Sequence, residues 1–124
     1  MVPQDARLVA IVDDDESIRS ALLGLMKVVG VPAQAFGSAE EFLESGVQRR
    51  TGCLIADVRM PGMSGLELQA ALRTADCSFP IIFITAHGNK HMRARALKAG
   101  AIEFFAKPFD QEALVARVQA VLKR

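Results

Sequence analysis

The sequence is poor in cysteine and lacks both a long apolar run and a leader-like N-terminus. Its two cysteines, Cys53 and Cys77, are too few for a disulfide framework and match no Cys-x-x-Cys or metal-binding spacing. No apolar stretch approaches the ~18 residues that a membrane-spanning helix needs, and the start, MVPQDARL, lacks the basic-then-apolar order of a signal peptide. We therefore expect a soluble, cytoplasmic domain with no membrane contact.

An excess of charge of one sign is also lacking. Lys and Arg number 15 against 14 Asp and Glu, which leaves a net charge of +1. Binding to a nucleic-acid backbone needs a clustered basic surface, so this balance argues against direct nucleic-acid binding by the domain. It favours a protein partner, or a small charged ligand bound at one spot.

Length and composition fit one compact domain. The chain has 124 residues, of which 51% are hydrophobic, enough to form a core and unlike a disordered segment. We expect a single domain over residues 1–124, with its core at about residues 7–123, because no linker, repeat or low-complexity segment interrupts the sequence.

Short apolar runs alternate with segments of helical period. Strands are predicted at residues 8–12, 33–36, 53–56, 81–84 and 102–106. Apolar residues three and four apart predict helices between them, two of which begin with a capping box, Ser38 to Glu41 and Ser64 to Glu67. The alternation predicts an α/β fold, a doubly wound parallel sheet of five strands, for which the flavodoxin-like order 2-1-3-4-5 is common.

Polar side chains stand at the ends of four predicted strands. Ligands of an open parallel sheet bind outside the carboxyl ends of its strands, where the strand order reverses. The second strand, at an edge, offers nothing polar at its end. The residues that end or follow the other four strands are Asp13, Asp14, Asp15, Asp57, Thr85 and Lys107. The candidates therefore gather where this fold would place a site.

The residue types at these ends suit phosphoryl chemistry on a divalent metal. Carboxylates crowded into one pocket raise one another's pKa unless a cation lies among them. Hard oxygen ligands suit Mg²⁺ or Mn²⁺, and a carboxylate beside such a metal is a competent nucleophile that forms an aspartyl phosphate. The metal, a lysine and a hydroxyl group would each meet one oxygen of the transferred group.

Four short motifs carry a family resemblance. The stretches VDDD, DVRMPGMSG, TAH and KPF resemble the signatures of the response-regulator receiver family, in the family's order and approximate spacing. The combinations TAHG, KAGAIEF and RMPGMSG most resemble the FixJ-type branch of that family. Each motif alone is weak, but together they are specific and span residues 10–109. The resemblance implies the flavodoxin-like (CheY-like) fold with five helices.

The resemblance also implies a phosphoacceptor and a metal site. Asp57 would accept the phosphoryl group, and Asp13 and Asp14 would hold the metal with Asp57 and the backbone carbonyl of Arg59. The Arg59 side chain would reach back over the acidic pocket and weaken metal binding until it moves aside. His87, two residues past Thr85, would border the path of an attacking water and modulate the lifetime of the phosphate.

A switch is implied by three further positions. Thr85 would bond a phosphoryl oxygen and move toward it, and Lys107 would contact the same group, with a cis bond between Lys107 and Pro108. Phe104 stands where the family keeps an aromatic side chain that moves in behind the threonine. The fourth helix, fifth strand and fifth helix would then change as one surface.

Each candidate also has a purely structural explanation. Asp15 is best explained as a helix cap, and Asp57, Thr85 and Lys107 taken singly are ordinary residues at strand ends. Phe104 and Phe105 must point to opposite faces of their strand, so either could be plain core. A functional site is favoured only because all of these residues are predicted to lie at the same end of one sheet.

The function expected is a phosphorylation-activated switch of a bacterial two-component system. A sensor histidine kinase or an acyl phosphate would donate to Asp57, and slow autodephosphorylation would be the chain's only turnover, so it is not expected to be an enzyme. We expect a homodimer on phosphorylation, and an output through a C-terminal DNA-binding domain or a separate effector that acts in transcription regulation.

Two other functions remain open from the sequence. A haloacid-dehalogenase-type phosphohydrolase would use Asp13 as nucleophile and Asp15 as acid/base, although the chain is short for such an enzyme and its TAH and KPF motifs would have no role. The second alternative is a receiver-like docking module that is never phosphorylated, although such modules usually lack an acidic residue, the threonine or the lysine of the site.

Overall fold

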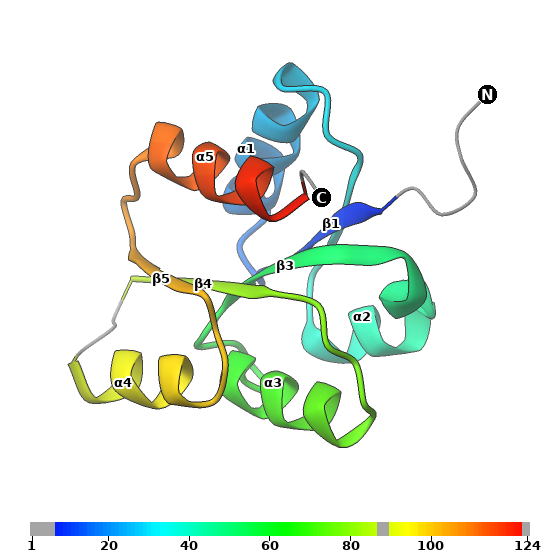
Figure 1. Cartoon of the computed structure of the whole chain (residues 1–124), viewed down its shortest axis with the longest axis vertical. Helices are drawn as coiled ribbons and strands as arrows, with labels where there is room; N and C mark the ends of the chain where they lie inside the picture. Colours follow the sequence, from blue (N-terminus) through cyan, green and yellow to red (C-terminus); the bar gives the residue numbers. More distant parts are fainter. Residues whose placement is uncertain (1–6, 87–89, 123–124) are drawn as a thin grey trace.

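The computed structural model describes residues 7–86 and 90–122, in which strands and helices alternate along the chain (Figure 1). The elements in chain order are β1 (Leu8–Val12), α1 (Glu16–Val28), β2 (Ala33–Phe36), α2 (Ala39–Ser45), the 3-10 helix η1 (Val47–Arg50), β3 (Thr51–Asp57), α3 (Gly65–Thr74), β4 (Ile81–Thr85), α4 (Lys90–Lys98), β5 (Glu103–Ala106) and α5 (Gln111–Leu122).

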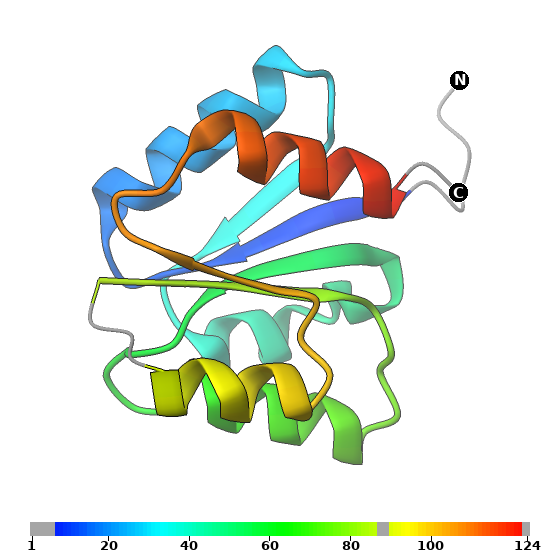
Figure 2. The same cartoon turned by 60° about the vertical axis from the view of Figure 1, so that its left-hand side comes forward.

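The strands form one parallel sheet in the order β2-β1-β3-β4-β5, which confirms the predicted fold. Figure 2 shows the sheet between two layers of helices, with α1 and α5 on one face and α2, α3 and α4 on the other. Alternate strand residues serve the two layers, as the pleat requires: Val9 and Ile11 pack with α1 and α5, whereas Ala10 and Val12 pack with the other three helices.

The third strand is longer than predicted. It begins at Thr51, which pairs with Leu8 of β1, and it continues through Asp57, which pairs with Ile84 of β4. The 3-10 helix that leads into it was not predicted, because four residues are too few for a periodic signal. The consequence for function is that Asp57 is the last residue of a central, buried strand and not part of a loop.

The two predicted capping boxes turn out differently. Ser64 accepts from the Glu67 backbone N–H and the Glu67 side chain accepts from the Ser64 N–H, so this box is complete. Ser38 likewise caps α2 through the Glu41 N–H, but the Glu41 carboxylate accepts from Gly37 instead of Ser38. The predicted box at α2 is therefore half right, and its second half ties down the residue that follows β2.

The turn that closes the C-terminal end of α3 contains a residue in the left-handed conformation that is not glycine. Asp76 has φ of 63°, and the bonds from the Asp76 N–H to the Arg73 carbonyl and from the Cys77 N–H to the Leu72 carbonyl close the last turn. This position usually carries glycine, although Asp is among the few residues that tolerate it.

We predict that Asp76→Gly leaves the free energy of unfolding within ~0.5 kcal/mol of the parent, while Asp76→Val lowers it by about 1–2 kcal/mol, because a β-branched side chain is strained at this φ. Urea unfolding measures both. Ala75→Val, at a φ of −85°, is the matched control; an equal loss in Asp76→Val and Ala75→Val would contradict the assignment of strain to the left-handed position.

Candidate phosphoacceptor site

Four predicted site residues meet at one end of the sheet. Asp13 follows β1, Asp57 ends β3, Thr85 ends β4 and Lys107 follows β5. The strands are parallel, so their carboxyl ends lie at the same edge. The register places Asp57 beside Ile84 and Thr85 beside Ala106, and the Lys107 N–H donates to the Thr85 carbonyl at 2.8 Å.

Lys107 bridges two carboxylates that lie far apart in the sequence. Its Nζ is 3.0 Å from Asp13 Oδ2 and 2.9 Å from Asp57 Oδ2. Asp13 is fully buried and Asp57 is 6% exposed, so both charges need a partner. A single ammonium group thus offsets much of the cost of burying two negative charges.

Burial and pairing act in opposite directions on the pKa values of these groups. Burial raises the pKa of Asp13 above its ordinary value, although hydrogen bonds from the Asp15 N–H and from Lys107 act to lower it. Burial acts to lower the pKa of Lys107, but the hydrogen bonds to Asp57 and Asp13 and the negative charges of both together outweigh it, and the net pKa is raised. Lys107 is therefore firmly cationic at neutral pH.

The remaining carboxylate oxygens are held by backbone groups. Asp13 Oδ1 accepts from the Asp15 N–H at 2.9 Å, and Asp57 Oδ1 accepts from the Arg59 N–H at 3.1 Å. Asp15 accepts from the Ser17 N–H as the N-cap of α1, as predicted for that residue. Each buried carboxylate is thus fixed by one backbone donor and by the same lysine.

The acidic cluster fits a divalent metal. Asp13, Asp14 and Asp57 each offer a carboxylate oxygen, and these oxygens lie within 4.8 Å of one another. Opposite ligands of an octahedral Mg²⁺ are about 4.2 Å apart, at ~2.1 Å from the ion, so small side-chain movements suffice. Asp14 is exposed, which leaves one side of the cluster open to water and to a substrate. The donors are all hard oxygens, as Mg²⁺ or Mn²⁺ prefers.

The predicted switch residues are buried. Thr85 is 1% exposed and Phe104 is 8% exposed. The Phe104 ring packs against Phe83, with ring centroids 6.5 Å apart, on the face covered by α2, α3 and α4, whereas Phe105 packs on the α1 and α5 face. The prediction that the two rings point to opposite faces is confirmed. The ring of Phe104 already lies inward in this structure.

Two predicted modulating residues remain predictions. The Arg59 side chain is exposed, and within residues 7–86 and 90–122 it makes no hydrogen bond or ion pair. Metal binding by the Arg59 carbonyl therefore stays a prediction, as does cover of the pocket by the guanidinium. His87 lies outside the described residues.

Three residues that the sequence did not single out shape the site. Arg19 Nη1 donates to the Asp13 carbonyl at 2.8 Å, and Glu40 Oε2 of α2 accepts from the Met63 N–H at 2.9 Å, in the loop after Asp57. Gly65 begins α3 so close to β3 that a Cβ there would overlap the Asp57 carbonyl oxygen. Arg19 lies one helical turn after Asp15, and this spacing could have indicated that its side chain reaches back toward the acidic residues. Glu40 contacts a residue 23 positions away, and no spacing in the sequence indicated that contact.

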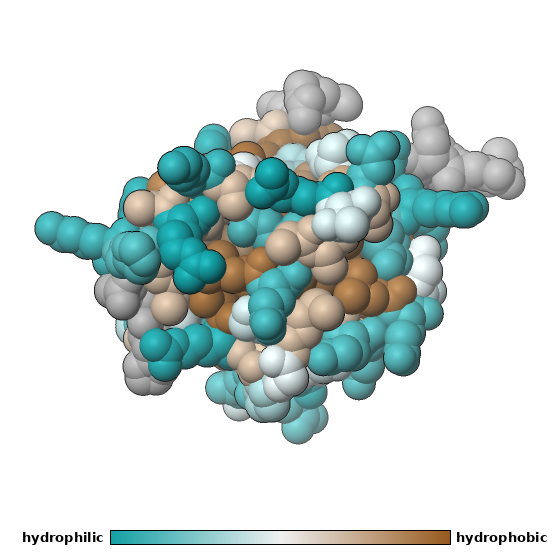
Figure 3. Space-filling view, turned by 90° about the horizontal axis from the view of Figure 1, so that it is seen from below, coloured by the Kyte–Doolittle hydropathy of each residue, from teal (hydrophilic) through white to brown (hydrophobic). Residues whose placement is uncertain are grey.

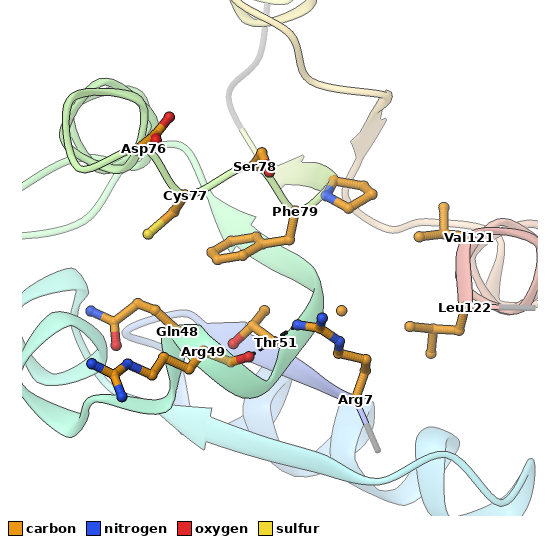
Figure 4. Close-up of a pocket in the computed structure, with 12 residues that line it drawn as sticks. Arg7, Gln48, Arg49, Thr51, Asp76, Cys77, Ser78, Phe79, Val121 and Leu122 are labelled. Atoms are coloured by element: carbon orange, nitrogen blue, oxygen red, sulfur yellow. Dashed lines mark hydrogen bonds between the residues drawn. The ribbon is translucent and has the colours of Figure 1, made fainter. Parts of the chain in front are cut away.

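A hollow at the opposite end of the sheet carries none of these groups. Its volume is about 480 Å³, and its lining includes Arg7, Thr51 at the start of β3, and Phe79 (Figure 4). The Arg7 guanidinium donates to the Arg49 carbonyl at 3.0 Å, which ties the strand entrance to η1. Thr51 and Asp57 are opposite ends of the same strand, so this hollow is separate from the carboxylate cluster.

Comparison with known proteins agrees with the motifs. The sequence profile of the family described as "Response regulator receiver domain" matches residues 9–119. The response regulator protein TodT of Pseudomonas putida is 44% identical over 118 residues, which are 95% of this chain and 52% of TodT. Nodulation protein W of Bradyrhizobium diazoefficiens is 49% identical over 114 residues, 91% of this chain and 50% of that protein. The chain thus spans about half the length of these curated relatives.

A solved structure extends the agreement to three dimensions. The crystal structure of FixJ-N matches with a TM-score of 0.85 at 35% identity, covering 100% of this chain and 97% of that one. Among the described residues, no helix is both long and apolar enough to cross a membrane.

We predict that Gly65→Ala lowers the free energy of unfolding by about 1–3 kcal/mol, because the added methyl group must displace the end of β3 or the start of α3. Thermal or urea unfolding measures this. Gly24→Ala is the matched control, since a Cβ there meets nothing within 4 Å and lies within α1, where alanine is favoured over glycine. Equal stability of the two variants would contradict the close approach at Asp57.

Proposed function

The chain belongs to the response regulator receiver family of two-component systems, and from that premise we propose that it is a switch activated by phosphorylation of Asp57. The observation that carries the proposal is the contact of Lys107 with both Asp57 and Asp13 inside a cluster of three carboxylates. A buried nucleophile, a cation and a set of metal ligands are the parts that phosphoryl transfer requires.

The proposed donor is the phosphohistidine of a sensor kinase or a small acyl phosphate. In the transfer, an Asp57 carboxylate oxygen forms a bond to phosphorus while the bond from phosphorus to the donor breaks, and the donor leaves with the electron pair of that bond. Lys107 Nζ, already 2.9 Å from Asp57, is placed to contact an oxygen of the transferred group and to offset its charge. Slow hydrolysis of the resulting acyl phosphate would reset the switch.

Asp13, Asp14 and Asp57 would hold Mg²⁺ or Mn²⁺, with the Arg59 carbonyl as a further ligand. When bound, the metal supplies positive charge to the transferred phosphoryl group and to the acidic cluster around it. Arg19 would support this arrangement by holding the Asp13 carbonyl, and the Arg59 N–H by holding Asp57 Oδ1.

Thr85 and Phe104 are the proposed link between the site and the surface. Thr85 lies at the end of β4 beside Ala106, and its carbonyl accepts from the Lys107 N–H. A shift of the threonine hydroxyl toward the phosphoryl group would therefore be felt by β5, on which Phe104 packs against Phe83. The surface of α4, β5 and α5 would change and would control the formation of a homodimer or the binding of an effector. An output in transcription is consistent with the name of one longer relative, the transcriptional regulatory protein FixJ.

A phosphohydrolase of the haloacid-dehalogenase type is not favoured. Asp15, its required acid/base, is engaged as the N-cap of α1, where its carboxylate accepts from the Ser17 N–H. A docking module that is never phosphorylated would not need the lysine and the three carboxylates together.

We predict that incubation with Mg²⁺ and acetyl phosphate adds one phosphoryl group, observed as a mass increase of the intact chain, and that beryllofluoride shifts the chain from monomer to dimer in sedimentation. Asp57→Ala should abolish both changes. The control is Asp76→Asn, which removes an exposed carboxylate at a left-handed position that Asn tolerates, and it should behave as the parent.

The outcomes separate the parts of the proposal. An adduct that persists in Asp57→Ala would contradict the choice of phosphoacceptor. An Asp57-dependent adduct with no change in sedimentation would leave the phosphoacceptor in place and contradict the homodimer.

A further inference from the structure

The helices α3 and α4 lie side by side on one face of the sheet (Figures 1 and 2). Two adjoining hollows, of about 440 and 320 Å³, form the α3–α4 groove and share Gln69, Arg73 and Ala99 in their lining. The groove lies off the carboxylate cluster, and the proposed phosphoryl transfer does not use it.

The lining of the α3–α4 groove includes apolar side chains and one buried amide. Leu66, Ala70 and Ala99 line the groove, and Gln69, which is 3% exposed, donates from Nε2 to the Ala96 carbonyl at 3.2 Å. This hydrogen bond joins α3 to α4 across the groove. Seen from below, the face formed by the three helices shows apolar surface across its middle, bordered by hydrophilic side chains (Figure 3).

The larger hollow of the groove is bordered by cations. Arg73 of α3 and Arg95 and Lys98 of α4 line it, and no acidic residue does, whereas Asp76 lines the smaller hollow. The ion pairs within residues 7–86 and 90–122 involve Lys107 and Arg117, so none of the three has a described carboxylate within 4 Å. Like charges around one groove repel one another, and a bound anionic group would relieve this repulsion.

We propose that the α3–α4 groove binds an acidic amphipathic helix of a partner protein. The apolar side chains of the partner helix would pack on Leu66, Ala70 and Ala99. The carboxylates of that helix would form ion pairs with Arg73, Arg95 and Lys98. The ten residues of α3 give a groove about 15 Å long, which matches roughly three turns of a helix packed against two others.

The apolar part of the lining favours a protein partner over a nucleic acid. A phosphate backbone gains its affinity from a broad basic surface and makes no use of a narrow apolar groove. The acidic helix uses the apolar and the cationic parts of the surface at once.

The test is an NMR titration of the isotope-labelled chain at low ionic strength. The ligand is a synthetic helical peptide that carries leucine on one face and glutamate on the other. We expect the amide signals of Gln69, Ala70 and Ala99 to shift and the affinity to fall as salt is added. The same peptide with lysine in place of glutamate should not bind.

Matched charge variants on α4 locate the contact. The double variant Arg95→Gln and Lys98→Gln should weaken binding by roughly fivefold, the usual range for losing two exposed charge contacts. The double variant Lys90→Gln and Arg93→Gln removes the same charge from the same helix outside the groove lining, and it should retain the parent affinity.

Three results would overturn the proposal: equal weakening by both double variants, signal shifts that map elsewhere, or equal binding of the lysine peptide. Tighter binding of a short DNA duplex than of the acidic peptide at the same amides would assign the groove to nucleic acid instead.

Discussion

The contact of one lysine with two buried carboxylates is the interaction on which the site depends. Asp13 follows β1 and Asp57 ends the neighbouring strand β3. Both are almost completely withdrawn from water, and an unpaired charge in such a place costs several kcal/mol. Lys107 joins them although it lies 94 and 50 residues away in the sequence, because β5 reaches the same edge of the sheet two strands from β3. The fold therefore concentrates charge that no local segment could hold, and the proposed chemistry follows from that concentration.

The segments around the cluster are fixed from several directions. Arg19 of α1 holds the chain after β1, Glu40 of α2 holds the loop after β3, and Gly65 lets α3 begin against the Asp57 carbonyl. These contacts lie on the side of β1 and β3, and the proposed movement is assigned to the side of β4 and β5, where Thr85 and Lys107 share a backbone hydrogen bond. The proposed α3–α4 binding groove shares α4 with the proposed switch surface, so the two surfaces adjoin along that helix.

Much of this arrangement follows from local sequence signals. Continuous apolar runs predicted the five strands, their alternation with helices predicted the parallel order, and the polar residues at strand ends predicted which side chains would meet. What could not be predicted depends on distances between segments. The Glu41 carboxylate accepts a hydrogen bond from Gly37 instead of Ser38, and Glu40 accepts one from a residue 23 positions away. The cations of α3 and α4 line one groove only because the two helices pack side by side. Neither periodicity nor motif spacing carries that information.

The most direct measurement of the central claim is the free energy of unfolding of Lys107→Met with and without Mg²⁺. Without the metal, the variant should lose about 3 kcal/mol, because two buried carboxylates lose their common partner. Mg²⁺ should restore more stability to the variant than it adds to the parent, since the ion takes up the unpaired charge at the same carboxylates. Lys98→Met, which removes an exposed cation with no described ion pair, controls for loss of charge alone. A Lys107→Met chain as stable as Lys98→Met, with no added response to Mg²⁺, would contradict the account.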